Sequence, residues 1–392
     1  MYRILGLTVF LIIYGSLYPW HFASPEPGTN PFLVLLHSWP REWDRFTLRD
    51  SYINLELYFP LGAAALPALR RRIRRVAAVA ATLCLVLGIS LLVEMLQVYI
   101  PGRTCSLFDT LCNLAGALAG LIAMTAVRYT SRRLALDANP AAASALLLLA
   151  CLAGNQFAPF FPIPSILRLQ TELHLLLHPT ELSTIGIWGW AAAWLVVAVA
   201  VEALAGQVRL RWLILILTLR IALRPFVVTA PLELDEVLGA ALAMLLWRLL
   251  PETSRLHAAL AMLVSTIVWR GLLPFHFVPA APLSWLPFRD TFDAYRESAM
   301  VVLLRQTFEV GALVWLLRRA GISYTRAAAV TAIPLLVLAY IERYLSGKML
   351  SVTQPALVVI TAFLLCLIER QYRPSTYRPL DTTLGTLKAA HS

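Results

Sequence analysis

Long apolar runs recur along the whole chain, and short polar segments separate them. A helix needs about 20 mainly apolar residues to cross the hydrocarbon core of a bilayer, so each run predicts a membrane helix. Several runs are shorter than a full crossing, and the pattern therefore predicts ten to twelve spans. We place them near residues 4–20, 53–69, 76–98, 107–127, 142–159, 183–205, 209–225, 235–250, 256–274, 298–317, 326–345 and 355–369.

Composition agrees with an all-α, polytopic transmembrane bundle. Hydrophobic residues make up 59% of the 392 residues and charged residues only 14%, a balance far from that of soluble globular chains. No small-residue cleavage site follows the first apolar run, so we interpret that run as an uncleaved first span. The net charge of +11 lies mostly in short loops, which indicates membrane topology and argues against nucleic acid as a partner.

The distribution of arginines predicts the orientation. If the N-terminus is cytoplasmic, every even-numbered connection carries an excess of basic residues, including the run Arg70-Arg71-Arg72-Ile73-Arg74-Arg75. The positive-inside rule then predicts that both termini are cytoplasmic. The five cysteines form no CxxC pair, so we expect no disulfide framework, no metal site and no cofactor.

The stretch from Ser90 to Gly120 concentrates polar residues where a membrane helix ends and the next begins. Glu94 and Gln97 share a helical face, Pro101-Gly102 ends that helix, and Arg103 stands in the turn. A carboxylate within a membrane segment costs roughly 2.5–3.5 kcal/mol unless it faces protein, water or a partner. The stretch is therefore either a polar clamp for a helical hairpin or a ligand or catalytic site at one membrane face.

The predicted topology brings further polar residues to the same outer face. We expect a binding cluster made of Arg49, Asp50, Asn54, Glu94, Gln97, Arg103, Asp109 and Asn113. On the helix after the turn, small residues follow the polar ones at spacings that let another backbone approach closely. We expect helix packing at Pro60, Gly62, Gly116 and Gly120.

The two ends of the chain resemble one another. Tyr18-Pro19-Trp20-His21-Phe22 matches Leu273-Pro274-Phe275-His276-Phe277, and Phe59-Pro60-Leu61-Gly62 matches Phe308-Glu309-Val310-Gly311. A middle copy is weaker, so the chain has two or three four-helix units. We expect units at 1–135, 136–255 and 256–372, the later ones with a degraded polar set, and a disordered cytoplasmic tail at 373–392.

These motifs resemble the VanZ-like family over about residues 5–127, with a fainter echo at 257–370. The residues that carry the resemblance are Asp50, Asn54, Phe59-Pro60-Leu61-Gly62, Glu94, Gln97, Pro101, Arg103, Asp109, Asn113, Gly116 and Gly120. The family is named for a membrane protein linked to teicoplanin resistance, and its biochemical activity is not established. The resemblance implies a bacterial inner-membrane protein of the cell envelope.

Three functions are compatible with this pattern. The first is binding or shielding of a lipid-linked glycan, a polyprenyl-linked envelope precursor or an anionic lipid headgroup, with envelope-biosynthesis proteins as further partners. The second is a transporter or flippase, which repeats and intramembrane charges favour. Separately, Arg220 and Arg224 either extend outward to the membrane surface or pair with Glu233, Asp235 or Glu236. The third is an acid/base enzyme that uses Glu94 and Asp109, which we rank lower because no nucleophilic serine or histidine accompanies them.

Overall fold

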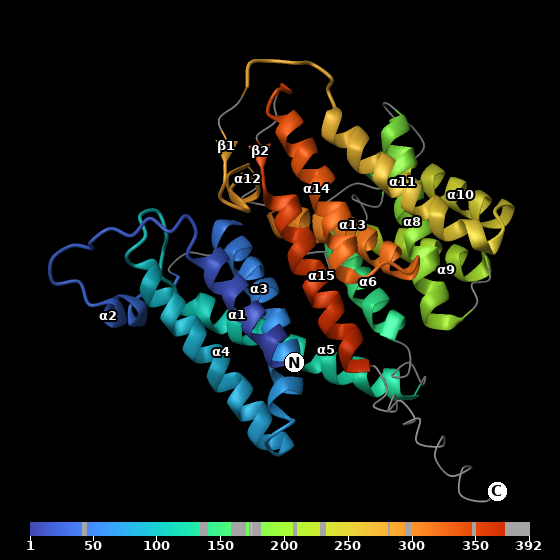
Figure 1. Cartoon of the computed structure of the whole chain (residues 1–392). Helices are drawn as coiled ribbons and strands as arrows, with labels where there is room; N and C mark the ends of the chain where they lie inside the picture. Colours follow the sequence, from blue (N-terminus) through green and yellow to red (C-terminus); the bar gives the residue numbers. More distant parts are fainter. Residues whose placement is uncertain are drawn as a thin grey trace, which may run out of the picture.

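The computed structural model of the chain is a bundle of helices with one short strand pair (Figure 1). It describes residues 1–40, 45–133, 140–157, 170–171, 174, 182–206, 210–227, 233–280, 283–294, 299–346 and 350–372. The helices are α1 (Tyr2–Ser16), α2 (Pro31–Leu36), α3 (Arg45–Leu69), α4 (Arg75–Gln97), α5 (Leu107–Arg133), α6 (Pro140–Phe157), α8 (Thr184–Ala205), α9 (Leu210–Val227), α10 (Leu234–Leu249), α11 (Glu252–Leu272), α12 (Arg289–Ala294), α13 (Ala299–Arg319), α14 (Tyr324–Glu342) and α15 (Thr353–Tyr372).

Six helices among the described residues are long and apolar enough to cross a membrane. They are Arg75–Gln97, Leu107–Thr130, Thr184–Ala205, Ala299–Arg319, Tyr324–Glu342 and Thr353–Arg370. Two shorter apolar helices cover Tyr2–Ser16 and Ala141–Phe157. The predicted all-helical fold is therefore confirmed and six helices are candidate membrane spans, whereas the count of about twelve spans and the repeat units stay predictions.

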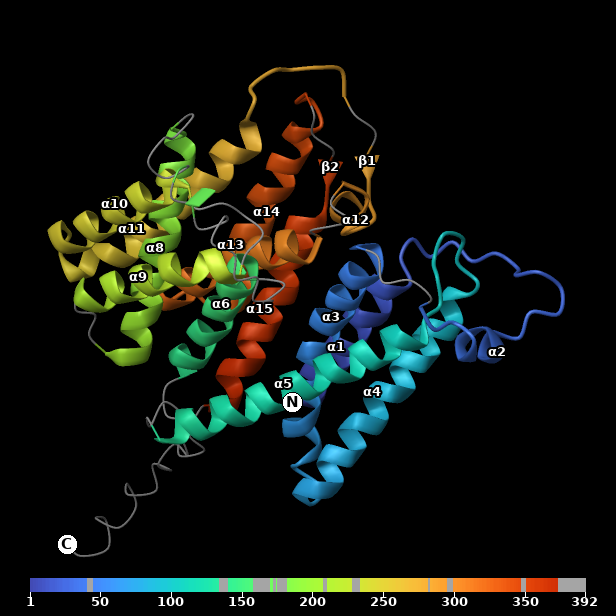
Figure 2. The same cartoon turned by 180° about the vertical axis from the view of Figure 1, so that it is seen from behind.

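The first unit consists of α1, α3, α4 and α5. Helix α3 packs along α5, α4 contacts both of them, and α1 lies against α3 and α4. Figure 2 shows α5 running diagonally across the unit from the end of α4. A small core at the centre is formed by the buried residues Ile12, Tyr58, Leu61, Val86 and Ala117.

The remainder of the chain packs around one larger core. Buried residues of α6, α8, α10, α11, α13, α14 and α15 form a single cluster, so the predicted segments 136–255 and 256–372 share their hydrophobic interior. Helix α1 joins this body to the first unit. The Tyr14 hydroxyl donates to the Pro287 carbonyl at 2.9 Å, and the Tyr18 ring lies 5.1 Å from the Phe292 ring, centroid to centroid.

A two-residue parallel ladder fixes one end of the C-terminal helices. Strand β1 (Leu283–Ser284) pairs with β2 (Leu350–Ser351), which directly precedes α15. Nearby, an isolated bridge joins Phe277 to Leu345.

The start of α3 differs from the start of the second predicted span. We placed the second span at 53–69, but α3 begins at Arg45. No proline or glycine interrupts residues 45–53, so the helix continues beyond the apolar run into the polar boundary zone. Asp50 and Asn54 therefore lie one turn apart on α3. The predicted tail at 373–392 lies outside the described residues.

Candidate functional site

The polar residues of the first unit gather at one end, where α3 begins, α4 ends and α5 begins. Glu94, in the last turn of α4, is at the centre, with a side chain that is only 2% exposed. Its Oε2 accepts a hydrogen bond from the Ser106 backbone N–H at 2.9 Å. Asp109 and Arg103 both lie close enough to Glu94 to interact with it electrostatically. We call Asp50, Asn54, Ser90, Glu94, Gln97, Arg103, Asp109 and Asn113 the polar cluster.

The start of α5 is built around Ser106. The Ser106 hydroxyl accepts the Asp109 backbone N–H at 3.3 Å, as an N-cap residue does. Because Glu94 holds the backbone N–H of Ser106, a side chain of α4 fixes where α5 begins. The backbone N–H of Leu107 is bound by the Ser38 hydroxyl at 2.9 Å. The first turn of α5 is therefore positioned by two other parts of the chain.

Deeper in the unit, a buried hydrogen bond joins α4 to α5. The Asn113 amide nitrogen donates to the Ser90 hydroxyl at 2.9 Å, and Asn113 is 1% exposed. The amide oxygen of Asn113 is buried and has no hydrogen-bond partner among the described residues. The Thr110 hydroxyl, one turn away, is in the same state. A buried polar atom without a partner costs about 1–3 kcal/mol, so this pair is a place where a ligand or a water could bind.

Arg103 and Gln97 fasten the end of α1 to the cluster. The Arg103 guanidinium donates to the Tyr18 carbonyl from Nε at 3.3 Å and from Nη2 at 3.1 Å. The Gln97 amide donates to the Ser16 carbonyl at 3.1 Å. Arg103 is exposed at the same time, so its guanidinium faces the surroundings of the cluster as well as α1.

The first turns of α3 complete the cluster. The Asn54 side chain hydrogen-bonds to the Asp109 carboxylate, and Asp50, which is exposed, lies near the same carboxylate. The Arg49 side chain lies outside the described part of the chain. The structure thus brings together seven of the eight predicted binding residues.

Small residues let α3 and α5 approach with their backbones in contact. A Cβ added at Gly62 would overlap the Ala117 carbonyl, one at Gly116 the Leu55 carbonyl, and one at Gly120 the Phe59 carbonyl. Pro60 lies within α3 and is exposed on its outer side. The close approach of α3 and α5 is what brings Asn54 next to Asp109.

Residues 2–128, which contain the whole cluster, match the family described as VanZ/LLP1. Over these residues the chain is similar to the VanZ-like family. No curated protein and no solved structure matches the chain.

The surroundings of the VanZ-like cluster also affect a nearby thiol. Cys105 lies in the turn between α4 and α5, and burial raises the pKa of its thiol to about 12, with Glu94 and Asp109 adding to the shift. Among the described residues, no group of three or more histidine, cysteine, aspartate or glutamate side chains is arranged to hold a metal ion. The polar cluster itself contains carboxylates, the side-chain amides of Asn54, Gln97 and Asn113, and the guanidinium of Arg103.

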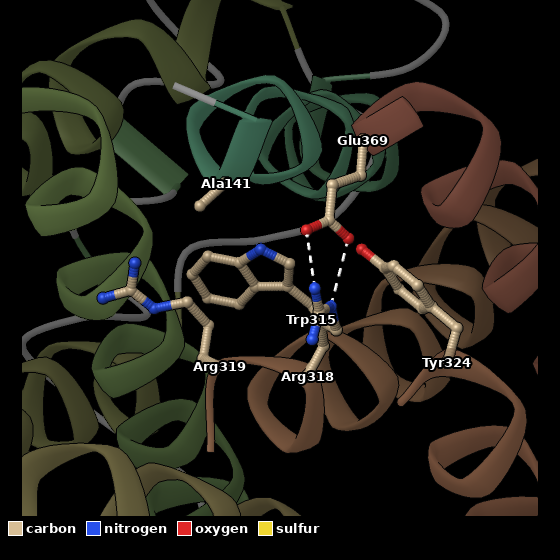
Figure 3. A pocket seen from close by; sticks show the side chains of 6 residues that line it. All are labelled: Ala141, Trp315, Arg318, Arg319, Tyr324 and Glu369. Carbon is tan, nitrogen blue, oxygen red and sulfur yellow. Dashed lines mark hydrogen bonds and ion pairs between the residues drawn. The ribbon is translucent and has the colours of Figure 1, made fainter. Parts of the chain in front are cut away.

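Outside the VanZ-like unit, the structure contains polar contacts that the sequence pattern did not reveal. Arg318 of α13 donates to both oxygens of Glu369 of α15, at 3.1 and 2.9 Å, and Tyr324 points to the same carboxylate (Figure 3). These residues line a pocket of about 250 Å³ together with Ala141, Trp315 and Arg319. The pairing went unnoticed because the two partners lie on different helices, 51 positions apart.

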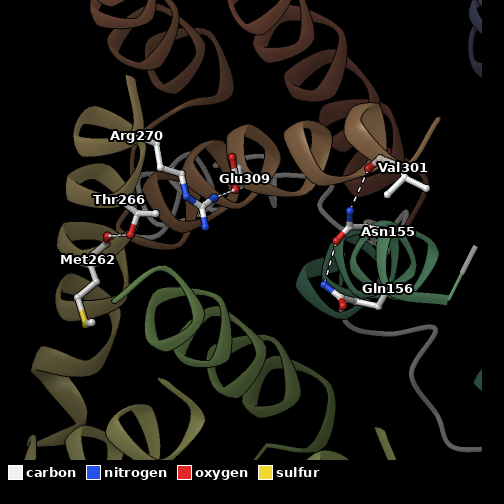
Figure 4. A network of polar contacts seen from close by, with 7 residues as sticks. All are labelled: Asn155, Gln156, Met262, Thr266, Arg270, Val301 and Glu309. Carbon is white, nitrogen blue, oxygen red and sulfur yellow. Dashed lines mark hydrogen bonds and ion pairs between the residues drawn. The ribbon is translucent and has the colours of Figure 1, made fainter. Parts of the chain in front are cut away.

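Helix α13 is held by two further polar contacts (Figure 4). Arg270 of α11 donates to Glu309 at 2.6 Å, and Asn155 of α6 donates to the Val301 carbonyl at 3.0 Å. On the other side of α6, Arg220 of α9 pairs with the buried Glu236 of α10. The larger body therefore contains interhelical ion pairs as well as an apolar core.

Proposed function

We propose that the VanZ-like unit binds the headgroup of a lipid-linked glycan at the membrane surface, through the polar cluster. The observation that carries this proposal is a comparison within the chain. Gly102 and Ser106, before α5, match Gly347 and Ser351, before α15, at a shift of 245 residues. At the same shift from Ser90, Glu94 and Asn113, α14 and α15 carry Leu335, Ala339 and Val358. All three are buried, and α14 and α15 pack closely together.

An apolar interior is thus sufficient to hold such a helix pair. Replacing a buried polar network by well-packed apolar residues is often neutral or stabilising, so a network retained only as a clamp has little advantage. The polar cluster is better explained by a ligand. The Asn113 amide oxygen, which has no hydrogen-bond partner in the described part of the chain, supports this interpretation because it needs a donor.

The chemistry of the cluster favours a ligand rich in hydrogen-bond donors. Asp50, Glu94 and Asp109 outnumber the single guanidinium of Arg103, which already binds the Tyr18 carbonyl. An anionic group alone would be repelled by the carboxylates. Sugar hydroxyls and amide N–H groups can instead donate to carboxylate and amide oxygens, while the guanidinium can meet a phosphate at the rim. A polyprenyl-linked envelope precursor combines these groups.

The wider organisation belongs to the same proposal. We propose that residues 256–372 form a second unit related to the first, that the segment 136–255 is a degenerate unit, and that both termini lie on the cytoplasmic side of a bacterial inner membrane. Matched hydrogen bonds support the relation: Ala23 N–H donates to the Tyr99 carbonyl at 2.7 Å, and Val278 N–H donates to the Tyr344 carbonyl at 2.8 Å.

Native mass spectrometry of the purified full-length protein, with its lipids identified, tests the binding proposal. We expect the wild-type protein to carry a glycan lipid and both Glu94→Gln and Asp109→Asn to lose about tenfold or more in occupancy, since hydrogen bonds to charged groups contribute about 1.5–3 kcal/mol. Glu342→Gln, an acid-to-amide change at the corresponding helix end of the second unit, is the matched control and should retain the lipid. Equal occupancy in all four proteins would contradict the proposal.

A transporter is the second candidate, and the buried ion pair between Arg220 and Glu236 favours it, because paired charges within membrane helices are usual in carriers. It predicts that Glu236→Gln abolishes movement of a labelled glycan lipid between leaflets of proteoliposomes but leaves binding unchanged. An acid/base enzyme is less well supported, because Glu94 and Asp109 each already accept a hydrogen bond from the protein.

A further inference from the structure

The opposite end of the VanZ-like unit contains a second pocket, far along α4 and α5 from the polar cluster. It has a volume of about 210 Å³ and lies between the end of α3, the start of α4 and the last turns of α5. Leu66, Pro67 and Met124 supply apolar walls. The remaining lining residues are polar or charged: Arg70, Arg75, Thr125, Arg128 and Tyr129. We call this the arginine pocket.

The pocket in Figure 3 occupies the corresponding place in the C-terminal unit. On α13, Trp315 and Arg319 take the positions of Leu66 and Arg70, shifted by 249 residues, the shift that relates Gly62 to Gly311. On α15, Glu369 takes the position of Met124, shifted by the 245 residues that relate Ser106 to Ser351. The two pockets are therefore lined by the same parts of matching helices.

Their charges are balanced differently. In the C-terminal pocket the Glu369 carboxylate lies within the site and binds Arg318 through both oxygens. In the arginine pocket the corresponding residue is Met124, and among the described lining residues three are arginines and none is acidic. At the same 249-residue shift Arg319 corresponds to Arg70 and Arg318 to Leu69, so the two pockets share one arginine position. The arginine pocket has further arginines of its own and no acidic residue in its described lining.

Local backbone geometry adds to this positive field. Arg74 is the N-cap of α4, and no side chain among the described residues caps that helix start. The exposed N–H groups of a helix N-terminus favour an anion. At the end of α3, the Leu66 carbonyl accepts a hydrogen bond from the Arg70 N–H and the Leu69 carbonyl accepts one from the Arg72 N–H.

We propose that the arginine pocket binds the phosphate group of an anionic lipid, which takes the place that the Glu369 carboxylate fills in the second unit. Arginine forks match phosphate oxygens bidentately, and basic pockets between helix ends at a membrane surface suit acidic headgroups. The walls formed by Leu66, Pro67 and Met124 lie against the glycerol and the first acyl carbons. This site is separate from the glycan site proposed above and does not depend on it.

Substitution at Met124 gives a direct test with an isosteric control. Met124→Glu places an internal carboxylate among the arginines, and Met124→Gln has nearly the same shape without the charge. The probe is phosphatidylglycerol, titrated into the delipidated full-length protein and followed by native mass spectrometry, with phosphatidylcholine as the reference lipid. We expect Met124→Glu to weaken phosphatidylglycerol binding about tenfold or more, and Met124→Gln to bind as the wild type does.

A second pair of variants separates the pocket from general surface charge. Arg70→Gln/Arg75→Gln removes two lining arginines, and Arg71→Gln/Arg72→Gln removes two from the same loop that do not line the pocket. Both pairs remove the same charge, so any effect on topology or overall attraction would appear in both. We expect only the first pair to lose binding about tenfold. Equal losses, or a phosphatidylglycerol affinity no higher than that for phosphatidylcholine, would overturn the proposal.

Two further arms identify the source of the phosphate and keep the two sites apart. Excess inorganic phosphate should fail to displace phosphatidylglycerol; displacement would overturn the lipid assignment and leave a site for free phosphate. Glu94→Gln, which changes the polar cluster, should leave phosphatidylglycerol binding at the wild-type level. A loss of binding in Glu94→Gln would contradict a separate site, whatever the outcome for the glycan.

Discussion

The first unit and the C-terminal helices contain a turn of the same local geometry, but the helix pairs beside the two turns have different interiors. Trp20 and Phe275 both have positive φ, at 64° and 61°, and both follow a cis proline. The matched hydrogen bonds from Ala23 to Tyr99 and from Val278 to Tyr344 close the same turn. Similar turns can therefore form above two very different interiors.

At one end of the helix pair the first unit has the polar residues and the second unit the apolar ones, and at the other end the reverse holds. At one end the first unit has Glu94 and Asn113, and the second unit has Ala339 and Val358. At the other end the first unit has Met124, and the second unit has Glu369, which binds Arg318. In the second unit the Glu369 carboxylate is bound by Arg318 of the same unit. The first unit instead has the polar cluster at one end and the arginine pocket at the other. This contrast is what we expect when one unit binds ligands and the other supports the bundle.

The largest expected effect concerns the approach of α3 to α5, where Gly116 corresponds to Thr361 in the second unit. Gly116→Leu must displace the Leu55 backbone, and we expect it to destabilise the protein by at least about 3 kcal/mol. Gly88→Leu on α4 meets open space and is the matched control. Thermal unfolding in detergent measures both. Similar melting temperatures for the two variants would show that α3 and α5 do not pack by backbone contact.

Next in size is the reactivity of Cys105, which reports the carboxylates that the second unit lacks. A pKa of about 12 keeps the thiol protonated at neutral pH, so its alkylation should be about a hundredfold slower than that of an ordinary thiol. The rate should still rise with pH beyond pH 9, because the thiolate is the reactive form. The measurement is maleimide labelling of a variant that retains only this cysteine. A plateau near pH 8.5 would contradict the buried, acidic setting, and Glu94→Gln should speed the reaction.

A smaller effect is expected for the charges at the opposite ends of the two units. Arg318→Gln leaves the partly buried Glu369 carboxylate without its bidentate partner and should cost about 1–2 kcal/mol of unfolding free energy. Arg70→Gln in the first unit removes no such bond to a described carboxylate and should change stability by less than about 0.5 kcal/mol. Denaturant unfolding in detergent compares them. An equal loss of unfolding free energy in the two variants would contradict the proposed difference between the arginine pocket and the C-terminal pocket that contains Glu369.

Much of the fold could be predicted because apolar runs of membrane length leave few alternatives to helices. The polar cluster could be anticipated from Glu94, Asp109 and Asn113, since polar residues at helical spacing next to a proline-glycine turn must meet at one helix end. The arginine run 70–75 was interpreted only as a topology signal, because spacing along the chain does not show which helix ends form a pocket. The pairing of Arg318 with Glu369 was missed for the same reason.

The most direct test replaces three buried polar residues of the first unit by the apolar residues found at the corresponding positions of the second unit. The triple variant Ser90→Leu/Glu94→Ala/Asn113→Val should fold, and its melting temperature should lie within a few degrees of that of the wild type. It should carry no glycan lipid in native mass spectrometry. That result is predicted because the equivalent residues Leu335, Ala339 and Val358 already support a packed helix pair. A triple variant that fails to fold would show that the cluster is a structural clamp. One that folds and retains the lipid would contradict the proposed site.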